Sequence, residues 1–345
     1  MLRKLLKGKN KSKSEVVHKA SPFNYVHHES YDESEAASNT SSEAATSHGG
    51  PTTCPCGKYY RYEFTSELVA YNGGIELNLN VRMEDSIDSG THGTIYHAIL
   101  LQQSDICVVV KDMLFQHEYA PYQLKAANNE VSVLKKMAGD QSVIEYYGHN
   151  FVEYKDDAEI YGKFSIVLEL GGANLKSYIQ QNIVNINDED DKSQFITKVA
   201  GGAAHALRHY GIHMDIKPHN FVISLENNSD SRIIESKLID FSTSVYMDGK
   251  VTRKVDVYSF GVMIYKLLHK LNKDFDKINK NDLKIIKETP FFKARLNHNC
   301  IQIQPDHRPN ISAVDKFLKM ECDIFENEEK QLPKKFLSES EDPHC

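Results

Sequence analysis

The stretch His213-Met-Asp-Ile-Lys-Pro-His-Asn220 decides the fold, because it places a potential base, a cation and an amide ligand within eight residues. It follows an amphipathic helical pattern over 195–210 and precedes two short apolar runs, Phe221-Val-Ile223 and Lys237-Leu-Ile-Asp240. Proteins can hold a magnesium ion that bridges phosphates with an aspartate at the end of a buried strand and an asparagine nearby. The pattern therefore predicts Asn220 and Asp240 as metal ligands.

Upstream of this stretch, a lysine ends an apolar strand pattern, Val108-Val-Val-Lys111. A buried lysine is costly unless an anion pairs with it. The candidate partner is Glu130, which lies in a helical pattern over 122–138 and has apolar neighbours. Either residue alone would also fit ordinary surface charge.

A glycine turn, Asp88-Ser-Gly-Thr-His-Gly93, lies before a strand pattern over 95–99. A dinucleotide-binding fold needs a helix after such a turn, and here a strand follows instead. Gly90 and Gly93 fit a flap over a triphosphate, since glycine lets backbone N–H groups approach phosphate oxygens. An ordinary hairpin turn would have the same sequence pattern.

Taken together, these motifs resemble those of the eukaryotic protein kinases, of the serine/threonine type. The resemblance covers about residues 86–320 and implies an α+β, bilobal fold with a small β-rich N-lobe and a larger helical C-lobe. Five segments carry the resemblance, and the family pattern that each one resembles is given in parentheses: 108–111 (V-A-I-K), 213–220 (H-R-D-x-K-P-x-N), 240–242 (D-F-G), 256–261 (D-x-W-S-x-G) and 308–310 (Arg-Pro-Ser).

The resemblance also implies the chemistry, which is transfer of the ATP γ-phosphate to a Ser/Thr hydroxyl of a protein, with Mg²⁺ as metal. Lys111, held by Glu130, would bind the α- and β-phosphates, and Asp215 would accept the proton of the attacking hydroxyl. The implied roles are catalytic for Asp215 and Lys217, nucleotide-binding for Gly90, Gly93, Lys111, Glu130, Glu169 and Leu170 (the last two in the hinge), and metal-binding for Asn220 and Asp240.

The sequence departs from the family pattern at several positions. Asp88 replaces the first loop glycine, Met214 the arginine beside the catalytic aspartate, and Ser242 the glycine after Asp-Phe. Only fifteen residues, 241–255, separate Asp240 from Asp256, with no Ala-Pro-Glu motif, and Arg308 lacks the glutamate it pairs with in relatives. Two alternatives therefore stay open: a pseudokinase that acts as an ATP-binding regulatory scaffold, and a small-molecule kinase on the same fold.

Composition is that of a folded protein of about two domains, with 345 residues, 40% hydrophobic and 26% charged residues. A net charge of −7 argues against nucleic-acid binding. No apolar run reaches the length of a transmembrane segment, and residues 1–13 lack the continuous apolar run and small-residue cleavage site of a secretory signal. We therefore expect an intracellular protein of the cytoplasm or nucleus. The expected division is a disordered tail that is basic then acidic (1–57), the N-lobe (58–170), the C-lobe (171–320) and a charged C-terminal tail (321–345).

Three smaller segments also give expectations. The basic start, 1–19, fits weak contact with an anionic surface, and equally a solvated terminus. The acidic, Asn-rich stretch 185–191 is expected to be a surface loop. Among six cysteines only Cys54 and Cys56 lie close together; they could supply half of a zinc site, but no second Cys/His pair lies at ligand spacing, so two free thiols in a loop are expected.

Overall fold

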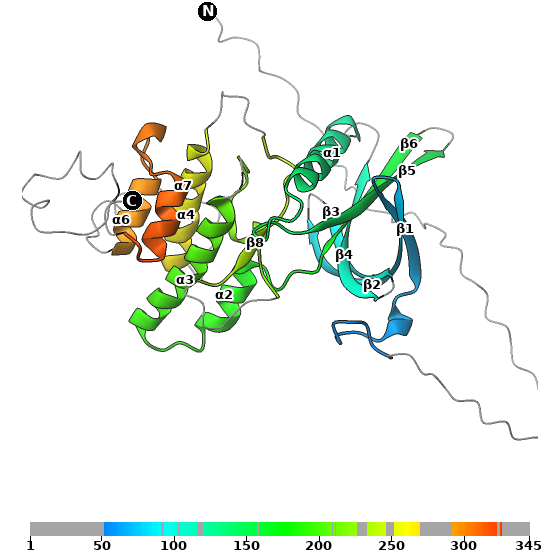
Figure 1. Ribbon diagram of the computed structural model, residues 1–345, viewed down its shortest axis with the longest axis horizontal. Coiled ribbons are helices and arrows are strands. Elements are labelled where there is room, and N and C mark those ends of the chain that lie inside the picture. Colours follow the sequence, from blue (N-terminus) through cyan, green and yellow to red (C-terminus); the bar gives the residue numbers. More distant parts are fainter. Residues whose placement is uncertain are drawn as a thin grey trace, which may run out of the picture. The chain divides into compact units, whose positions relative to one another are not determined.

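The computed structural model describes eleven parts of the chain: residues 52–90, 93–102, 104–115, 120–156, 159–208, 210, 212–225, 233–245, 252–269, 292–322 and 325. The structure therefore begins at Thr52, inside the segment 1–57 that composition assigned to the tail, and the basic start 1–19 lies outside the described residues. Most of the predicted tail 321–345 also lies outside them. Elements are labelled in Figure 1.

Six antiparallel strands form a closed barrel in the order β1-β2-β3-β4-β6-β5 (Figure 1). Closure depends on a single residue pair between β1 and β5, Tyr71 with His149. The strand bounds are β1 Ser66–Asn72, β2 Ile75–Gly90, β3 Gly93–Leu101, β4 Ile106–Phe115, β5 Tyr146–Asp156 and β6 Glu159–Glu169.

Side chains along β3 and β4 point alternately into the barrel core and to the opposite face of the sheet. Ala98, Leu100, Val108 and Val110 are buried together in the barrel, as expected for residues two apart on a strand. The strand β4 continues to Phe115, so the lysine predicted to end this strand lies within it. The ladder on both sides of Lys111 therefore fixes its backbone, with Ile95 of β3 and Ile166 of β6 as its paired residues.

Helix α1, Ala120–Lys136, confirms the helical pattern predicted over 122–138. Its apolar residues Ala127, Val131 and Leu134 recur at intervals of three and four, and all three are buried in the main core. Glu130 lies between Ala127 and Leu134 in this helix and is only 1% exposed. The helix therefore carries a carboxylate into the core.

The remaining elements are mostly helical. The core around them holds several fully buried aromatic rings, including those of Phe260 and Phe317. Within the described residues, no helix combines the length and the apolar character needed to cross a membrane. The bounds are α2 Leu175–Ile183, α3 Glu189–Arg208, β7 Phe221–Ile223, β8 Ser236–Leu238, α4 Lys254–His269, α6 Phe292–Cys300 and α7 Ile311–Leu318.

Residues 185–188 lie in a turn and a loop, as expected, but the N-terminus of α3 corrects the expectation of a loop over 189–191. The helix begins at Glu189, because Asp188 Oδ1 accepts hydrogen bonds from the backbone N–H groups of Asp190 (2.8 Å) and Asp191 (3.0 Å). Aspartate is a preferred cap, and acidic residues in a first turn interact favourably with the helix dipole. The acidic run is thus a helix start.

Candidate functional site

A buried charge cluster joins the barrel to the segment after β8. Lys111 Nζ lies 2.9 and 2.8 Å from the two carboxylate oxygens of Glu130 and 3.2 Å from Asp240 Oδ1. The side chain of Lys111 is 7% exposed and that of Glu130 is 1% exposed. Burial alone would lower the pKa of Lys111, but the charges of Glu130 and Asp240 outweigh it and raise the pKa. The structure thus brings together the lysine and the glutamate that the sequence paired.

A pocket of about 1040 Å³ opens beside this cluster. Its lining combines the glycine turn of β2 and β3, the end of β6 and the segment 216–222. Lining residues predicted from the sequence are Gly90, Gly93, Lys111, Glu130, Glu169, Leu170, Lys217, Asn220 and Asp240. Asp215 lies next to this lining rather than in it.

Gly93 is required where β3 begins. Its φ is +123°, and a Cβ there would lie 2.5 Å from the backbone oxygen of Asp112 and 2.9 Å from Met113 Cγ. Any other residue would therefore separate the glycine turn from β4. The close approach keeps the turn against the strand that carries Lys111.

The end of β6 presents Leu168 and Leu170 to the pocket, and both are largely buried. Between them, Glu169 accepts two hydrogen bonds from Lys237 Nζ, at 2.7 and 2.8 Å, and one from the backbone N–H of Glu145. The Glu169 side chain is therefore engaged in fixing the end of β6 to β8. Its backbone N–H also donates to the backbone oxygen of Glu145, at 2.9 Å.

The segment 213–220 folds into a compact loop whose polar groups converge. Asp215 Oδ2 accepts hydrogen bonds from Lys217 Nζ (2.6 Å) and Asn220 Nδ2 (2.9 Å). Asn220 Nδ2 also donates to the backbone oxygen of Asp215 at 2.8 Å. Asp215 and Lys217 are partly exposed, with 30% and 41% of their side chains accessible, whereas Asn220 is buried. The three residues predicted from the motif thus form one hydrogen-bonded unit.

Asp256, in the first turn of α4, holds this loop in place. Its carboxylate accepts the backbone N–H groups of His213 (2.7 Å) and Met214 (2.9 Å). Met214 has a φ of 68°, in the left-handed region that residues other than glycine rarely adopt. Burial raises the pKa of Asp256, against the lowering effect of those two hydrogen bonds. The sequence marked this aspartate only as part of a helix motif.

His213 links the loop to the strand that leads to Asp240. The imidazole Nδ1 accepts the N–H of Asp215 at 3.3 Å, and Nε2 donates to the backbone oxygen of Ile239 at 3.0 Å. One acceptor and one donor describe the neutral ring, and burial lowers the pKa of His213 in the same sense. The ring also packs on Phe241, at 5.2 Å between centroids, which fixes the residue after Asp240.

Asn129 of α1 is a site residue that the sequence interpretation missed. Its side-chain Nδ2 donates to the backbone oxygens of Phe241 (3.1 Å), Ser242 (3.4 Å) and Ser244 (2.8 Å). The helix that supplies Glu130 therefore also binds the backbone beyond Asp240. Because its three partners are backbone oxygens, no residue pattern in the sequence indicated this contact.

Arg308, expected to lack its family partner, has backbone partners here. Its guanidinium donates to the backbone oxygens of Gln302 (2.7 Å), Lys254 (2.8 Å) and Ile303 (3.1 Å), and it stacks over the Tyr258 ring. Three carbonyls and a ring thus satisfy the buried cation.

Comparison with known proteins agrees with this arrangement. A family model described as the protein kinase domain matches residues 81–252, about half of the chain. Similar curated proteins include a probable serine/threonine-protein kinase, ireA, of Dictyostelium discoideum, 25% identical over 302 residues, which cover 72% of this chain and 29% of that protein.

Two relatives from Schizosaccharomyces pombe are similarly distant. Aurora kinase is 24% identical over 222 residues, covering 55% of this chain and 57% of the relative. The sensor for unfolded proteins in the ER, ire1, is 25% identical over 181 residues, covering 51% of this chain and 15% of the relative. The alignments thus span between 15% and 57% of these three proteins.

Proposed function

Because the chain belongs to the eukaryotic protein kinase family, we propose that it is a serine/threonine protein kinase, which transfers the γ-phosphate of Mg-ATP to a protein hydroxyl. The β barrel would be the N-lobe and the helical part the C-lobe, with the nucleotide in the pocket that both line. The observation that carries the proposal is the buried pairing of Lys111 with both Glu130 and Asp240. An intracellular location, in the cytoplasm or nucleus, stays a prediction.

The free-energy cost of desolvating Lys111 supports a phosphate site, because a costly buried charge calls for a functional reason. A lysine desolvated to this degree stabilises a fold weakly even when paired. It lines an open pocket together with two carboxylates, so its charge is available to an anionic ligand. Phosphoryl transfer depends on such positioned charges more than on covalent chemistry.

The oxygen donors in the pocket suit magnesium, which prefers carboxylate and amide oxygens. Asn220 and Asp240 both line the pocket, and both side-chain hydrogen bonds described for Asn220 use Nδ2, which leaves Oδ1 for a cation. When bound there, Mg²⁺ would neutralise phosphate charge. These two residues are the proposed metal ligands.

Asp215 is the proposed base. Its Oδ2 takes the hydrogen bonds from Lys217 and Asn220, so Oδ1 remains to accept the proton of an incoming hydroxyl. Lys217 lies at the pocket lining, where its ammonium would neutralise charge on the transferring phosphate. Positioned bases contribute roughly 10²- to 10⁴-fold in rate.

The test compares the natural chain with Asp215→Asn, using transfer from γ-labelled ATP and the thermal shift produced by Mg-ATP. We expect Asp215→Asn to keep the shift and to lose transfer to protein. Lys192→Gln, in an exposed ion pair of α3 with Glu189, is the control and should keep both. Equal transfer by Asp215→Asn and the natural chain would refute the assignment of Asp215.

The alternatives predict different results in the same assay. A shift with Mg-ATP but no transfer to any acceptor would support the pseudokinase scaffold. Transfer to small hydroxylated metabolites and not to protein would support a small-molecule kinase, which the short interval between Asp240 and Asp256 favours. No shift with millimolar Mg-ATP would refute nucleotide binding altogether.

A further inference from the structure

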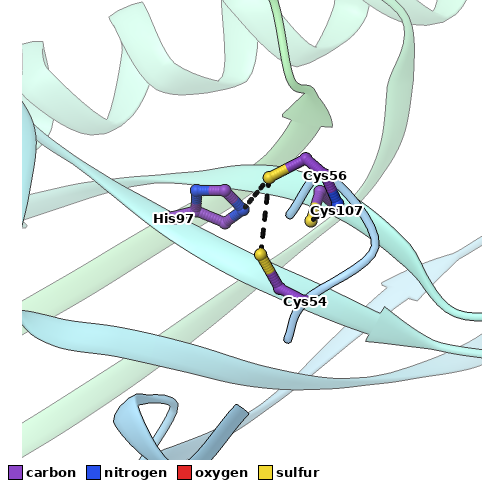
Figure 2. Close-up of side chains that lie close together, drawn as sticks. All are labelled: Cys54, Cys56, His97 and Cys107. Atoms are coloured by element: carbon purple, nitrogen blue, oxygen red, sulfur yellow. Dashed lines mark hydrogen bonds between the residues drawn. The ribbon is translucent and has the colours of Figure 1, made fainter. Parts of the chain in front are cut away.

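Four potential metal ligands converge at a place the proposed reaction does not use. Figure 2 shows the Cys54, Cys56 and Cys107 thiols facing the His97 ring, and the four ligand atoms all lie within 4.8 Å of one another. Cys54 Sγ and Cys56 Sγ are 3.4 Å apart, and Cys56 Sγ is 3.7 Å from His97 Nε2. Cys54 and His97 are each 2% exposed.

Strand register brings the two distant ligands together. In the β3–β4 ladder His97 pairs with Val109 and Ile99 pairs with Cys107, so His97 and Cys107 are diagonal neighbours on one face. The two residues lie ten positions apart on different strands, so spacing along the chain does not mark them as a ligand pair.

A turn before the barrel supplies the other two ligands. In Cys54-Pro-Cys-Gly57 the N–H of Gly57 donates to the backbone oxygen of Cys54 at 2.8 Å, and Gly57 has a φ of +73°. The tight turn directs both thiols to one side. The N–H of Cys56 donates to Cys107 Sγ at 3.3 Å, which ties the turn to the thiol on β4.

The distances agree with tetrahedral coordination. Tetrahedral zinc, bound at about 2.3 Å by sulfur and about 2.0 Å by nitrogen, places two ligand sulfurs about 3.8 Å apart and a sulfur and a nitrogen about 3.5 Å apart. The Cys54 Sγ to Cys56 Sγ distance of 3.4 Å and the Cys56 Sγ to His97 Nε2 distance of 3.7 Å are close to these values. Three thiolates around Zn²⁺ carry one net negative charge. Lys58 acts electrostatically on His97 and would offset that charge, whereas Arg82 is already paired with Glu63 and Asp85.

We propose that Cys54, Cys56, His97 and Cys107 form a structural zinc site of the Cys₃His type. All four positions of the tetrahedron come from the protein, which is typical of structural rather than catalytic zinc. Soft sulfur ligands with one imidazole also favour zinc over magnesium or calcium.

The site would fasten residues 52–64 to the outside of the barrel. This segment has a very small apolar core, in which Cys54, Phe64 and Ile99 are buried. The rings of Tyr59 and Phe64 pack edge-on against His97, at 5.1 and 5.5 Å between centroids, and hold the imidazole in place. The folding of units with so small an apolar core usually depends on additional stabilisation, such as a structural metal ion.

The experiment uses the full chain, expressed with added zinc and purified under reducing conditions. Elemental analysis should find one zinc per chain, and exchange for Co²⁺ should give the intense visible absorption of tetrahedral cobalt with thiolate charge transfer. Cys107→Ser and His97→Asn should each hold less than a third of the natural zinc content. Cys300→Ala, which removes a buried cysteine elsewhere in the chain, is the matched control and should keep one zinc.

A second measurement uses only the natural chain, so it tests the proposal even if the variants fail to fold. Chelation should release the zinc and make three more thiols reactive to a thiol reagent, and amide exchange should increase in 52–64. The proposal is overturned if the zinc-supplied chain holds less than a tenth of an equivalent and gives no thiolate–cobalt absorption. It is also overturned if Cys107→Ser binds as much zinc as the natural chain, or if chelation exposes no thiol.

Discussion

Replacing Glu130 by glutamine tests whether the buried charge cluster is built for function rather than for stability. At an effective dielectric of about 20, the contacts of Lys111 with Glu130 (2.8 Å) and Asp240 (3.2 Å) correspond to attractions of about 6 and 5 kcal/mol. Glu130→Gln removes the larger one and leaves Lys111 buried. Breaking a buried pair costs about 3–5 kcal/mol, and the remaining Asp240 contact places the expected loss near 3 kcal/mol.

The assay is urea unfolding of the natural chain, Glu130→Gln and the double variant Lys111→Met/Glu130→Leu. The double variant removes both charges, so we expect it to be more stable than Glu130→Gln by at least about 1 kcal/mol, while both lose the Mg-ATP thermal shift. Lys192→Gln, in an exposed pair, should change stability by less than about 0.5 kcal/mol. A free energy of unfolding for Glu130→Gln within about 0.5 kcal/mol of the natural value would refute this reasoning.

Three further predictions follow from the same geometry. Asp256→Asn leaves one acceptor oxygen for the two N–H groups of the His213 loop, so we expect a loss of about 1–3 kcal/mol in urea unfolding and slower phosphate transfer, with the Mg-ATP shift retained. Asn129→Ala removes the donor to three carbonyls beyond Asp240 and should also slow transfer, whereas an unchanged rate would show that this contact does not position Asp240. The raised pKa of Lys111 means that its stabilising contribution is complete below the unfolded pKa of about 10.4 and is lost only as pH rises through the folded value. The unfolding difference between the natural chain and Lys111→Met/Glu130→Leu, which leaves no unpaired Glu130 carboxyl to titrate, should therefore stay constant from pH 6 to 9.

Residues that act through short stretches of chain were accessible from the sequence. Asp215, Lys217 and Asn220 lie within six positions of one another, so the loop that joins them needs no distant partner to bring them together. The helix that carries Glu130 was visible because its apolar residues recur at helical spacing. The pairing with Lys111 then followed from the cost of burying a lone cation.

Features that depend on register or on backbone acceptors were not accessible in the same way. Asn129 bonds to carbonyl oxygens, which have no signature in a sequence. Helix α6 was not predicted, because Phe292–Cys300 carries two asparagines and a histidine among few apolar residues. Strand β1 closes the barrel through a single pair, which depends on its partner β5, eighty residues later in the chain.

One face of the β3–β4 hairpin contributes residues to both the proposed nucleotide pocket and the proposed zinc site. Ala98, Leu100, Val108 and Val110 are buried in the barrel, so the residues that alternate with them on β3 and β4 face the other way. Toward one end this face gives Ile95, Val109 and Lys111 to the pocket; toward the other it gives His97 and Cys107 to the cysteine cluster. A slip of β4 by one residue would turn Cys107, Val109 and Lys111 into the barrel core. Metal ligands that join β3 to β4 would therefore fix the register on which the orientation of Lys111 depends.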